Sequence, residues 1–196
     1  MLRIIAGKHR GRRIETKEHA KIRPTGSKTR GAIFNILLHG EFRGADASPL
    51  IGRRVVDVFC GTGALGFEAL SRGAEHVTFV DQSAESMSLV RNNARHMGEL
   101  DASDFVRSDS ASLPMARKAC SLAFLDPPYG TVLAVKSLRS LDRQGWLEHG
   151  AVAVVEMGAK DEFEPPEGYA QFDERKYGHT RIVFLRYDGM RDGKGT

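Results

Sequence analysis

The segment Asp126-Pro127-Pro128-Tyr129 combines residue types that can orient an amine nitrogen attached to a nucleic-acid base. Such a nitrogen is a weak nucleophile because its lone pair is delocalised into the ring. A carboxylate and a backbone carbonyl that accept its two N–H bonds favour a more tetrahedral, nucleophilic geometry. Prolines restrict the backbone, so the Asp126 carboxylate and the Pro127 carbonyl can face one position, and Tyr129 offers an aromatic surface for stacking. The alternative interpretation is a stiff loop without a chemical role.

A second segment, Gly61-Thr62-Gly63-Ala64-Leu65-Gly66, has the GxGxxG spacing of a nucleotide-cofactor loop. Asp81 lies 20 residues beyond Gly61, the separation at which an acidic residue accepts hydrogen bonds from ribose hydroxyls. A nicotinamide dinucleotide fits this pattern, and so does any other cofactor that contains adenosine. Asp57 and Asp109 add carboxylates that a pyrophosphate does not need, whereas an ammonium group and an adenine amine could use them. A tight turn without a ligand is the alternative interpretation.

Alternating strand and helix patterns would place these segments at one edge of a sheet. The predicted strands are five short apolar runs at 55–59, 76–80, 104–107, 121–125 and 151–155, and a closing antiparallel hairpin at 169–177 and 181–187. The pattern predicts an α/β fold with a doubly wound, mostly parallel, seven-stranded Rossmann-like sheet. Ligands of such sheets bind outside the carboxyl ends of the strands, where the glycine loop, Asp81, Asp109 and Asp126 all fall.

The helix predicted after the second strand has both a start signal and a buried face. Ser83 is a suitable N-cap, and Met87, Val90, Ala94 and Met97 follow at helical spacing. We therefore expect these four side chains to pack against the sheet.

Positive charge is concentrated in residues 1–30, which hold ten Lys and Arg residues against Glu15 and Glu18. The other 166 residues hold 19 basic and 23 acidic side chains, so a mildly acidic body carries a basic N-terminal segment. Short apolar runs around Gly7 and Gly11 predict a β-hairpin. We divide the chain into a hairpin extension at 1–22, a main domain at 23–187 and a disordered tail at 188–196. A basic hairpin suits nucleic acid, and its charge is also consistent with a solvated terminus.

Length and composition exclude several classes of protein. A chain of 196 residues with 41% hydrophobic and 28% charged residues is typical of one globular domain. Its longest apolar runs are far shorter than the ~20 residues of a membrane-spanning helix, and the charges near the N-terminus argue against a signal peptide. Cys60 and Cys120 are too few for a disulfide framework, and the histidines show no ligand spacing, so no metal is expected. We expect a cytoplasmic protein without membrane contact.

Taken together, these motifs resemble a known family. The segments Asp57-Val-Phe59-Cys-Gly61-Thr-Gly63, Asp81 and Asp126-Pro-Pro-Tyr129 are similar to those of class I S-adenosylmethionine-dependent amino methyltransferases. More narrowly, Arg3-Ile-Ile-Ala-Gly-Lys8-His-Arg-Gly-Arg12, Arg23-Pro-Thr25 and Phe34-Asn-Ile-Leu37 look like the bacterial 16S ribosomal RNA guanine-N2 methyltransferase D family. The resemblance runs from residue 2 to about residue 187. Gly31 departs from the family pattern, which usually has an acidic residue after the arginine at position 30.

The resemblance implies a monomeric enzyme with S-adenosylmethionine as its cofactor and 16S ribosomal RNA, within a small ribosomal subunit or an assembly intermediate, as its partner. It implies that Asp126 and the Pro127 carbonyl hold guanine N2, with Pro128 shaping the loop and Tyr129 stacking on the flipped base, without a metal or a covalent enzyme intermediate. The cofactor-binding residues it implies are Asp57, Phe59, Gly61, Thr62, Gly63, Asp81, Gln82, Asp109 and Ser110. The RNA-binding residues it implies are Arg3, Lys8, Arg10, Arg12, Arg13, Arg23, Lys28 and Arg30.

Other functions use parts of the same pattern. An adenine or cytosine amino methyltransferase acting on DNA or other RNA could use the same tetrapeptide, and only the N-terminal motifs separate it from the first hypothesis. A protein-glutamine methyltransferase typically has Asn in place of Asp126, and a dehydrogenase leaves residues 126–129 without a role. A non-catalytic RNA-binding protein of this fold would be expected to lose Gly61, Gly63 or Asp126, and all three are present.

Overall fold

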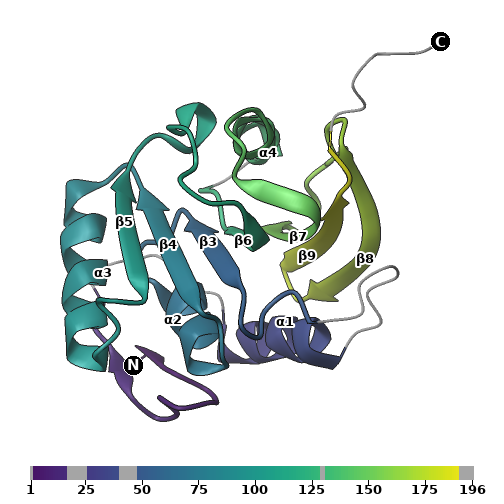
Figure 1. The fold of residues 1–196 in the computed structure, drawn as a ribbon. Helices are drawn as coiled ribbons and strands as arrows, with labels where there is room; N and C mark the ends of the chain where they lie inside the picture. Colours follow the sequence, from purple (N-terminus) through teal and green to yellow (C-terminus); the bar gives the residue numbers. More distant parts are fainter. Residues whose placement is uncertain (1, 17–25, 40–47, 129–130, 190–196) are drawn as a thin grey trace.

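The computed structural model describes residues 2–16, 26–39, 48–128 and 131–189, and its main feature is a sheet with helices on both faces (Figure 1). The strands are β1 (Leu2–Arg3), β2 (Arg13–Ile14), β3 (Arg54–Val58), β4 (His76–Asp81), β5 (Ser103–Arg107), β6 (Cys120–Leu125), β7 (Leu147–Gly158), β8 (Tyr169–Tyr177) and β9 (Thr180–Tyr187). The helices are α1 (Ser27–His39), α2 (Ala64–Ser71), α3 (Ala84–Met97) and α4 (Thr131–Arg143), with a short 3₁₀ turn at Ser110–Ser112.

The seven-stranded sheet has the order β5-β4-β3-β6-β7-β9-β8. The strands β3 to β7 pair in parallel, and β9 is antiparallel to both β7 and β8. Successive strands run outward from β3 to β5, and the chain then crosses back to place β6 on the other side of β3. This confirms the predicted doubly wound, mostly parallel Rossmann-like sheet and locates its switch point between β3 and β6.

The predicted elements differ from the observed ones mainly at their ends. The strand expected at 151–155 extends over Leu147–Gly158, because Leu147 pairs with Cys120 before the register shifts. The extension forms a hairpin, although only Leu2–Arg3 and Arg13–Ile14 pair as strands. Ser83 caps α3 as expected, with its side chain accepting a hydrogen bond from the Ser86 amide.

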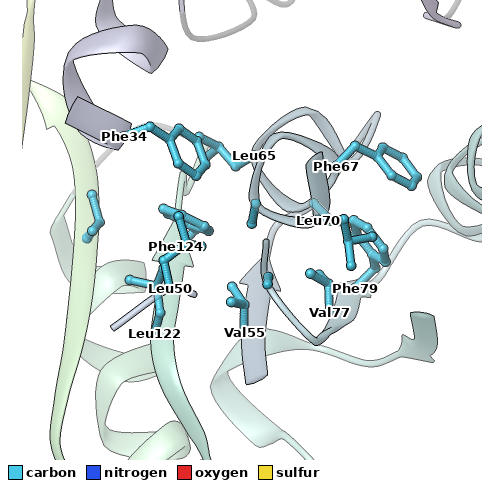
Figure 2. Packing of buried hydrophobic residues seen from close by; sticks show 14 of the residues in the cluster. Phe34, Leu50, Val55, Leu65, Phe67, Leu70, Val77, Phe79, Leu122 and Phe124 are labelled. Carbon is cyan, nitrogen blue, oxygen red and sulfur yellow. The ribbon is translucent and has the colours of Figure 1, made fainter. Parts of the chain in front are cut away.

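Each face of the sheet has its own apolar core. One face packs against α1, α2, α3 and the hairpin, and Figure 2 shows Phe34 of α1 and Phe67 of α2 over this face, with Phe79 and Phe124 rising from the strands. The other face packs against α4. The four α3 residues with helical spacing, Met87, Val90, Ala94 and Met97, are all buried on the first face. None of the helices in the described ranges is long and apolar enough to cross a membrane.

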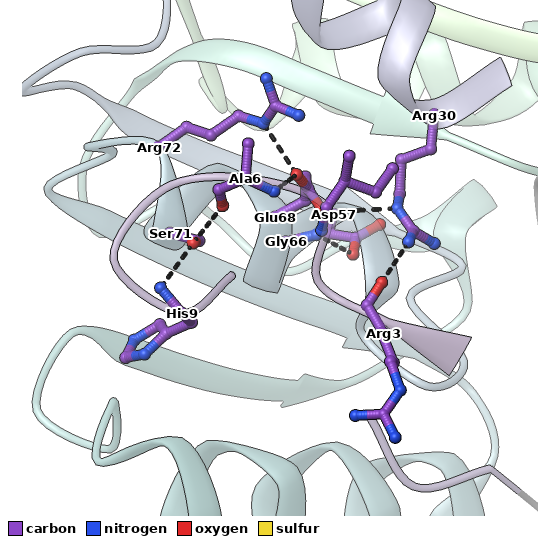
Figure 3. Close-up of polar contacts among 10 residues, drawn as sticks. Arg3, Ala6, His9, Arg30, Asp57, Gly66, Glu68, Ser71 and Arg72 are labelled. Atoms are coloured by element: carbon purple, nitrogen blue, oxygen red, sulfur yellow. Dashed lines mark hydrogen bonds and ion pairs between the residues drawn. The ribbon is translucent and has the colours of Figure 1, made fainter. Parts of the chain in front are cut away.

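The hairpin packs on the main domain rather than projecting from it. Ile4 and Ile14 are 2% and 1% exposed and belong to the first core. The buried carboxylate of Glu68 on α2 accepts hydrogen bonds from the backbone amides of Ile5 (2.9 Å) and Ala6 (3.1 Å). Figure 3 shows the contact between Ala6 and Glu68, with Glu68 and Ser71 of α2 facing the extension. The extension is therefore anchored to the helix that follows the glycine loop.

Candidate functional site

The glycine loop turns sharply from β3 into α2. Phe59 has a positive φ of 67°, a conformation that costs a non-glycine residue of order 1–3 kcal/mol and is concentrated at functional sites. Gly63, with φ 80°, precedes the first residue of α2, and a Cβ there would lie 2.5 Å from the Phe67 ring. Gly61 also has a positive φ, yet a Cβ at this position would have its nearest neighbouring atom 3.9 Å away. The loop is thus tightly packed on its protein side at Gly63 and open at Gly61.

Asp81, at the end of β4, fixes two neighbouring segments. One carboxylate oxygen accepts a hydrogen bond from the Gly61 amide (3.0 Å), and the other accepts one from the Ser83 amide (2.8 Å). A carboxylate can accept about four hydrogen bonds, so two more acceptor positions remain for the paired hydroxyls of a ribose. The 20-residue separation seen in the sequence becomes a direct contact between the acid and the loop.

Asp57 lies in β3, directly beneath the loop. Its side chain is 3% exposed, and its carboxylate accepts a hydrogen bond from the Gly66 amide at 2.9 Å (Figure 3). Burial raises the pKa of Asp57 to about 7; the Gly66 hydrogen bond opposes this rise and the charge of Asp81 adds to it. A cationic group beside this carboxylate would favour its ionised form.

Asp109 and Ser110 follow β5, two strands away from the glycine loop. The Asp109 side chain is exposed and caps the 3₁₀ turn by accepting a hydrogen bond from the Ala111 amide (2.9 Å). Ser110 is buried, whereas Gln82 is exposed at the end of β4 and its carbonyl accepts a hydrogen bond from Arg107. These residues lie at the same edge of the sheet as Asp81.

The segment Asp126-Pro127-Pro128 leaves the sheet at the end of β6. In the parallel register Leu125 is opposite Val58, so Asp126 begins where the glycine loop begins on the neighbouring strand. Asp126 and Pro127 are partly buried and Pro128 is exposed. Tyr129 lies outside the described residues. The switch point therefore has the glycine loop and Asp81 on one side and the proline-rich segment on the other.

Sequence comparison identifies the family. A family model described as Conserved hypothetical protein 95 matches residues 2–186. The chain belongs to this family. It is 32% identical over 160 residues to ribosomal RNA small subunit methyltransferase D of Escherichia coli, covering 79% of this chain and 74% of that one. The family is a methyltransferase family, so the chain is an enzyme that uses S-adenosylmethionine as its cofactor.

Solved structures share the fold of this chain. A hypothetical protein of Thermus thermophilus superposes with a TM-score of 0.69 at 25% identity, covering 94% of this chain and 98% of that one. An RNA methyltransferase of Salinibacter ruber, in complex with S-adenosylhomocysteine, gives a TM-score of 0.65 at 14% identity and covers 88% of this chain and 98% of that one. At 14% identity, the likeness to the Salinibacter ruber structure shows the fold alone.

The predicted RNA-binding cations of this family member divide by exposure. The exposed ones are Arg3, Lys8, Arg10, Arg12, Arg13 and Lys28. Lys8 pairs with Glu99 at 2.7 Å, and Arg12 donates a hydrogen bond to the Met97 carbonyl, so both also help to hold the hairpin on α3. Arg23 lies outside the described residues.

The prediction that Arg30 binds RNA is corrected by the structure. Its side chain on α1 is fully buried and lies 3.5 Å from the Glu68 carboxylate (Figure 3). A second guanidinium nitrogen donates a hydrogen bond to the Arg3 carbonyl at 2.5 Å. Arg30 thus joins α1, α2 and the extension inside the protein, where RNA has no access to it.

The sequence did not predict Asn93, which contacts the glycine loop, or Glu68, which anchors the extension to α2. Glu68 is a charged residue in the otherwise apolar helix Ala64–Ser71, and Asn93 lies three residues after Val90 on the buried face of α3. A polar residue at a position that periodicity assigns to the core was the available signal, because such a residue needs a hydrogen-bond partner. Among the described residues, no group of three or more His, Cys, Asp or Glu side chains is arranged to hold a metal ion.

Proposed function

We propose that the enzyme methylates the exocyclic N2 amine of a guanine in 16S ribosomal RNA after flipping that base out of its stack. The substrate is the small ribosomal subunit or an assembly intermediate, and the enzyme acts as a monomer in the cytoplasm. The observation that carries this proposal is the position of Asp126-Pro127-Pro128, which follows β6 beside the strand that carries the glycine loop. The names of the methyltransferase D relatives support ribosomal RNA as the substrate class.

The residues around the glycine loop fit S-adenosylmethionine by charge and by space. We assign the ribose hydroxyls to Asp81, the adenine end to Asp109 and Ser110 with Gln82 beside them, and the ammonium group to the side of Asp57. The open position at Gly61 lets the loop backbone, with Phe59, Thr62 and Gly63, approach the methionine part. When bound, this cofactor supplies a methyl group on a positively charged sulfur, from which an amine can displace it.

The proline-rich segment prepares the amine for that displacement. The Asp126 carboxylate and the Pro127 carbonyl accept the two N–H bonds, which directs the nitrogen lone pair toward the methyl group. The methylated nitrogen is a strong acid and loses its proton to water, so Asp126 serves first to orient. Tyr129 stacks on the flipped base, an interaction worth about 1–3 kcal/mol per base.

The exposed cations of the extension supply binding to the RNA backbone. Extruding a base costs a few kcal/mol, which contacts elsewhere on the RNA must offset. Arg10 and Arg13 of the hairpin and Lys28 at the start of α1 are exposed, so phosphates can reach them.

Transfer of labelled methyl groups from S-adenosylmethionine tests the proposal. Small ribosomal subunits from a strain that lacks this activity, free 16S ribosomal RNA and DNA are compared as substrates, with nucleoside analysis of the product. We expect N2-methylguanosine in the ribosomal RNA. Methylated adenine or cytosine, or methylation of DNA, would instead establish the alternative amino methyltransferase.

Asp126→Ala tests the assignment of the orienting carboxylate. We expect its turnover to fall at least ~10²-fold while S-adenosylhomocysteine still binds, as when one oriented polar group is removed from a catalytic site. Asp101→Ala is the matched control, since Asp101 is an exposed aspartate in the turn after α3. Near-normal turnover of Asp126→Ala would remove this residue from the mechanism.

A further inference from the structure

Asn93 connects the N-terminal extension to the glycine loop. Its side chain projects from α3 and is 1% exposed. The amide oxygen accepts a hydrogen bond from the Glu15 backbone N–H at 2.9 Å. The amide nitrogen donates two, to the Glu15 carbonyl and to the Thr62 carbonyl, each at 3.1 Å. Both N–H bonds of this amide are therefore used, and they reach two segments that are 47 residues apart in the chain.

The connection joins the extension, which is proposed to bind RNA, to the glycine loop, which is proposed to bind the cofactor. Glu15 follows β2, and its backbone N–H and carbonyl meet the amide as they would meet a neighbouring strand. Thr62 lies between Gly61 and Gly63, both of which have positive φ. Glycine adopts left-handed backbone without strain, but it loses more conformational freedom on ordering than other residues, and the hydrogen bond to Thr62 restrains the residue between the two glycines.

Other contacts hold the extension to α2 and α3 behind the loop. The Ser71 side chain accepts a hydrogen bond from the His9 amide at 2.9 Å (Figure 3), and Glu99 contacts Lys8 and His9. A shift of the extension at these contacts moves Glu15 relative to α3. The Asn93 amide then cannot keep its hydrogen bonds to both Glu15 and Thr62, so the position of the extension affects the loop.

We propose that Asn93 is a positioning residue that couples RNA binding by the extension to cofactor binding by the glycine loop. RNA that holds the hairpin in its anchored position also holds the Asn93 amide against Thr62, and this lowers the cost of ordering the loop when the cofactor binds. Because coupling between two binding sites is reciprocal, the bound cofactor equally strengthens RNA binding. The proposal rests on the proposed function, because it takes RNA as the ligand of the extension.

Equilibrium dialysis with labelled S-adenosylhomocysteine measures this coupling. Its dissociation constant is determined without and with saturating small ribosomal subunits that lack the modification. We expect the wild-type enzyme to bind at least about fivefold more tightly in the presence of subunits, the lower end of typical allosteric coupling. Asn93→Ala should bring this ratio to about one. Asn92→Ala, an exposed neighbour on the same helix, should keep the wild-type ratio.

A second variant weakens the same connection from the side of the extension. Glu15→Pro deletes the N–H that donates to the Asn93 oxygen, while the Glu15 carbonyl stays available to the Asn93 nitrogen; it also removes an exposed carboxylate that lies 3.4 Å from His96 of α3. The preceding residue, Ile14, is in a strand, a conformation that suits the position before proline. This variant should also lower the ratio toward one, and circular dichroism establishes that each variant is folded. If Asn93→Ala does not fold, Glu15→Pro decides the question.

The outcomes separate this proposal from the proposed function. A wild-type ratio of one, or a fivefold ratio kept by both variants, overturns the coupling even when methyl transfer to ribosomal RNA is normal. A wild-type enzyme that neither binds nor methylates ribosomal RNA overturns the proposed function itself. A ratio that falls in both variants, while circular dichroism shows both to be folded at the temperature of the binding measurement, supports coupling over a general loss of structure.

Discussion

The buried pair formed by Glu68 and Arg30 predicts very different costs for removing each partner. The Glu68 carboxylate accepts hydrogen bonds from the amides of Ile5 (2.9 Å) and Ala6 (3.1 Å) and from Nε of Arg72 (2.8 Å). Arg30 lies 3.5 Å away, and among the described residues its Nε and Nη1 have no hydrogen-bond partner. Burial lowers the pKa of Arg30, and only the attraction of Glu68 acts to raise it.

Glu68→Ala leaves a fully buried guanidinium without its counter-charge and two backbone amides without an acceptor. Removing one partner of a buried pair typically costs about 3–5 kcal/mol of unfolding free energy. Arg30→Met leaves Glu68 with its three remaining donors, and it deletes one buried charge, so we expect a loss of about 1–2 kcal/mol. In the double variant Arg30→Met should restore part of the stability that Glu68→Ala removes, with an interaction energy of about 1–3 kcal/mol.

Urea denaturation measures all three variants, followed by the fluorescence of Trp146, which is the only tryptophan and is 4% exposed. Glu75→Ala, an exposed glutamate in the turn after α2, is the control and should stay within about 0.5 kcal/mol of wild type. An Arg30→Met loss as large as that of Glu68→Ala, or a double variant that loses the sum of the two single losses, would contradict this difference between the two partners.

Three further predictions concern the hairpin and the loop. Gly7 and Gly11 have similar φ values of 84° and 82°, but a Cβ at Gly7 would lie 1.8 Å from a backbone oxygen of α2, whereas a Cβ at Gly11 would meet open space. Gly7→Ala should therefore lower the free energy of unfolding, measured by urea denaturation, by about 1–3 kcal/mol more than Gly11→Ala. Burial raises the pKa of Asp57 to about 7, so between pH 4 and 7 the folded state holds a proton there that the unfolded state has released. As the pH rises through this range, the free energy of unfolding should fall by up to about 1.4 kcal/mol per pH unit, and Asp57→Asn should flatten this slope. Replacing both Arg10 and Arg13 with alanine should weaken RNA binding and reduce its log–log salt slope by about 1.4 for single-stranded contacts; an unchanged slope would mean that these cations are only solvated.

Much of the site follows from the sequence because parallel strands bring their carboxyl ends to one edge. The order of strands and helices is enough to place Asp81 and Asp126 at that edge. The switch point between β3 and β6 then requires the glycine loop to lie between them. Helical spacing and the cap at Ser83 predict α3 and its buried face in the same way. These features depend on local pattern and on rules of chain topology.

Features that depend on one distant partner could not be predicted. Arg30 looked like one more cation in a basic segment, because its charge is visible in the sequence and Glu68, 38 residues later, gives no sign that the two will meet. Lys28, two residues earlier on the same helix, stays exposed. Which cation turns inward is decided by the face of α1 that packs on α2, and this requires the packing angle of the helices rather than their composition.

The extension contributes to the stability of the main domain as well as to its charge. Ile4 and Ile14 complete the core beneath α1, α2 and α3, and Glu68 depends on extension amides for two of its hydrogen bonds. Deleting residues 1–22 would therefore expose apolar surface and leave a buried carboxylate undersatisfied, so a loss of RNA binding in such a truncation would report on folding as well as on charge. Point substitutions at exposed cations such as Arg10 leave this core intact. They separate the contribution of charge to RNA binding from the contribution of the hairpin to stability, which the truncation combines.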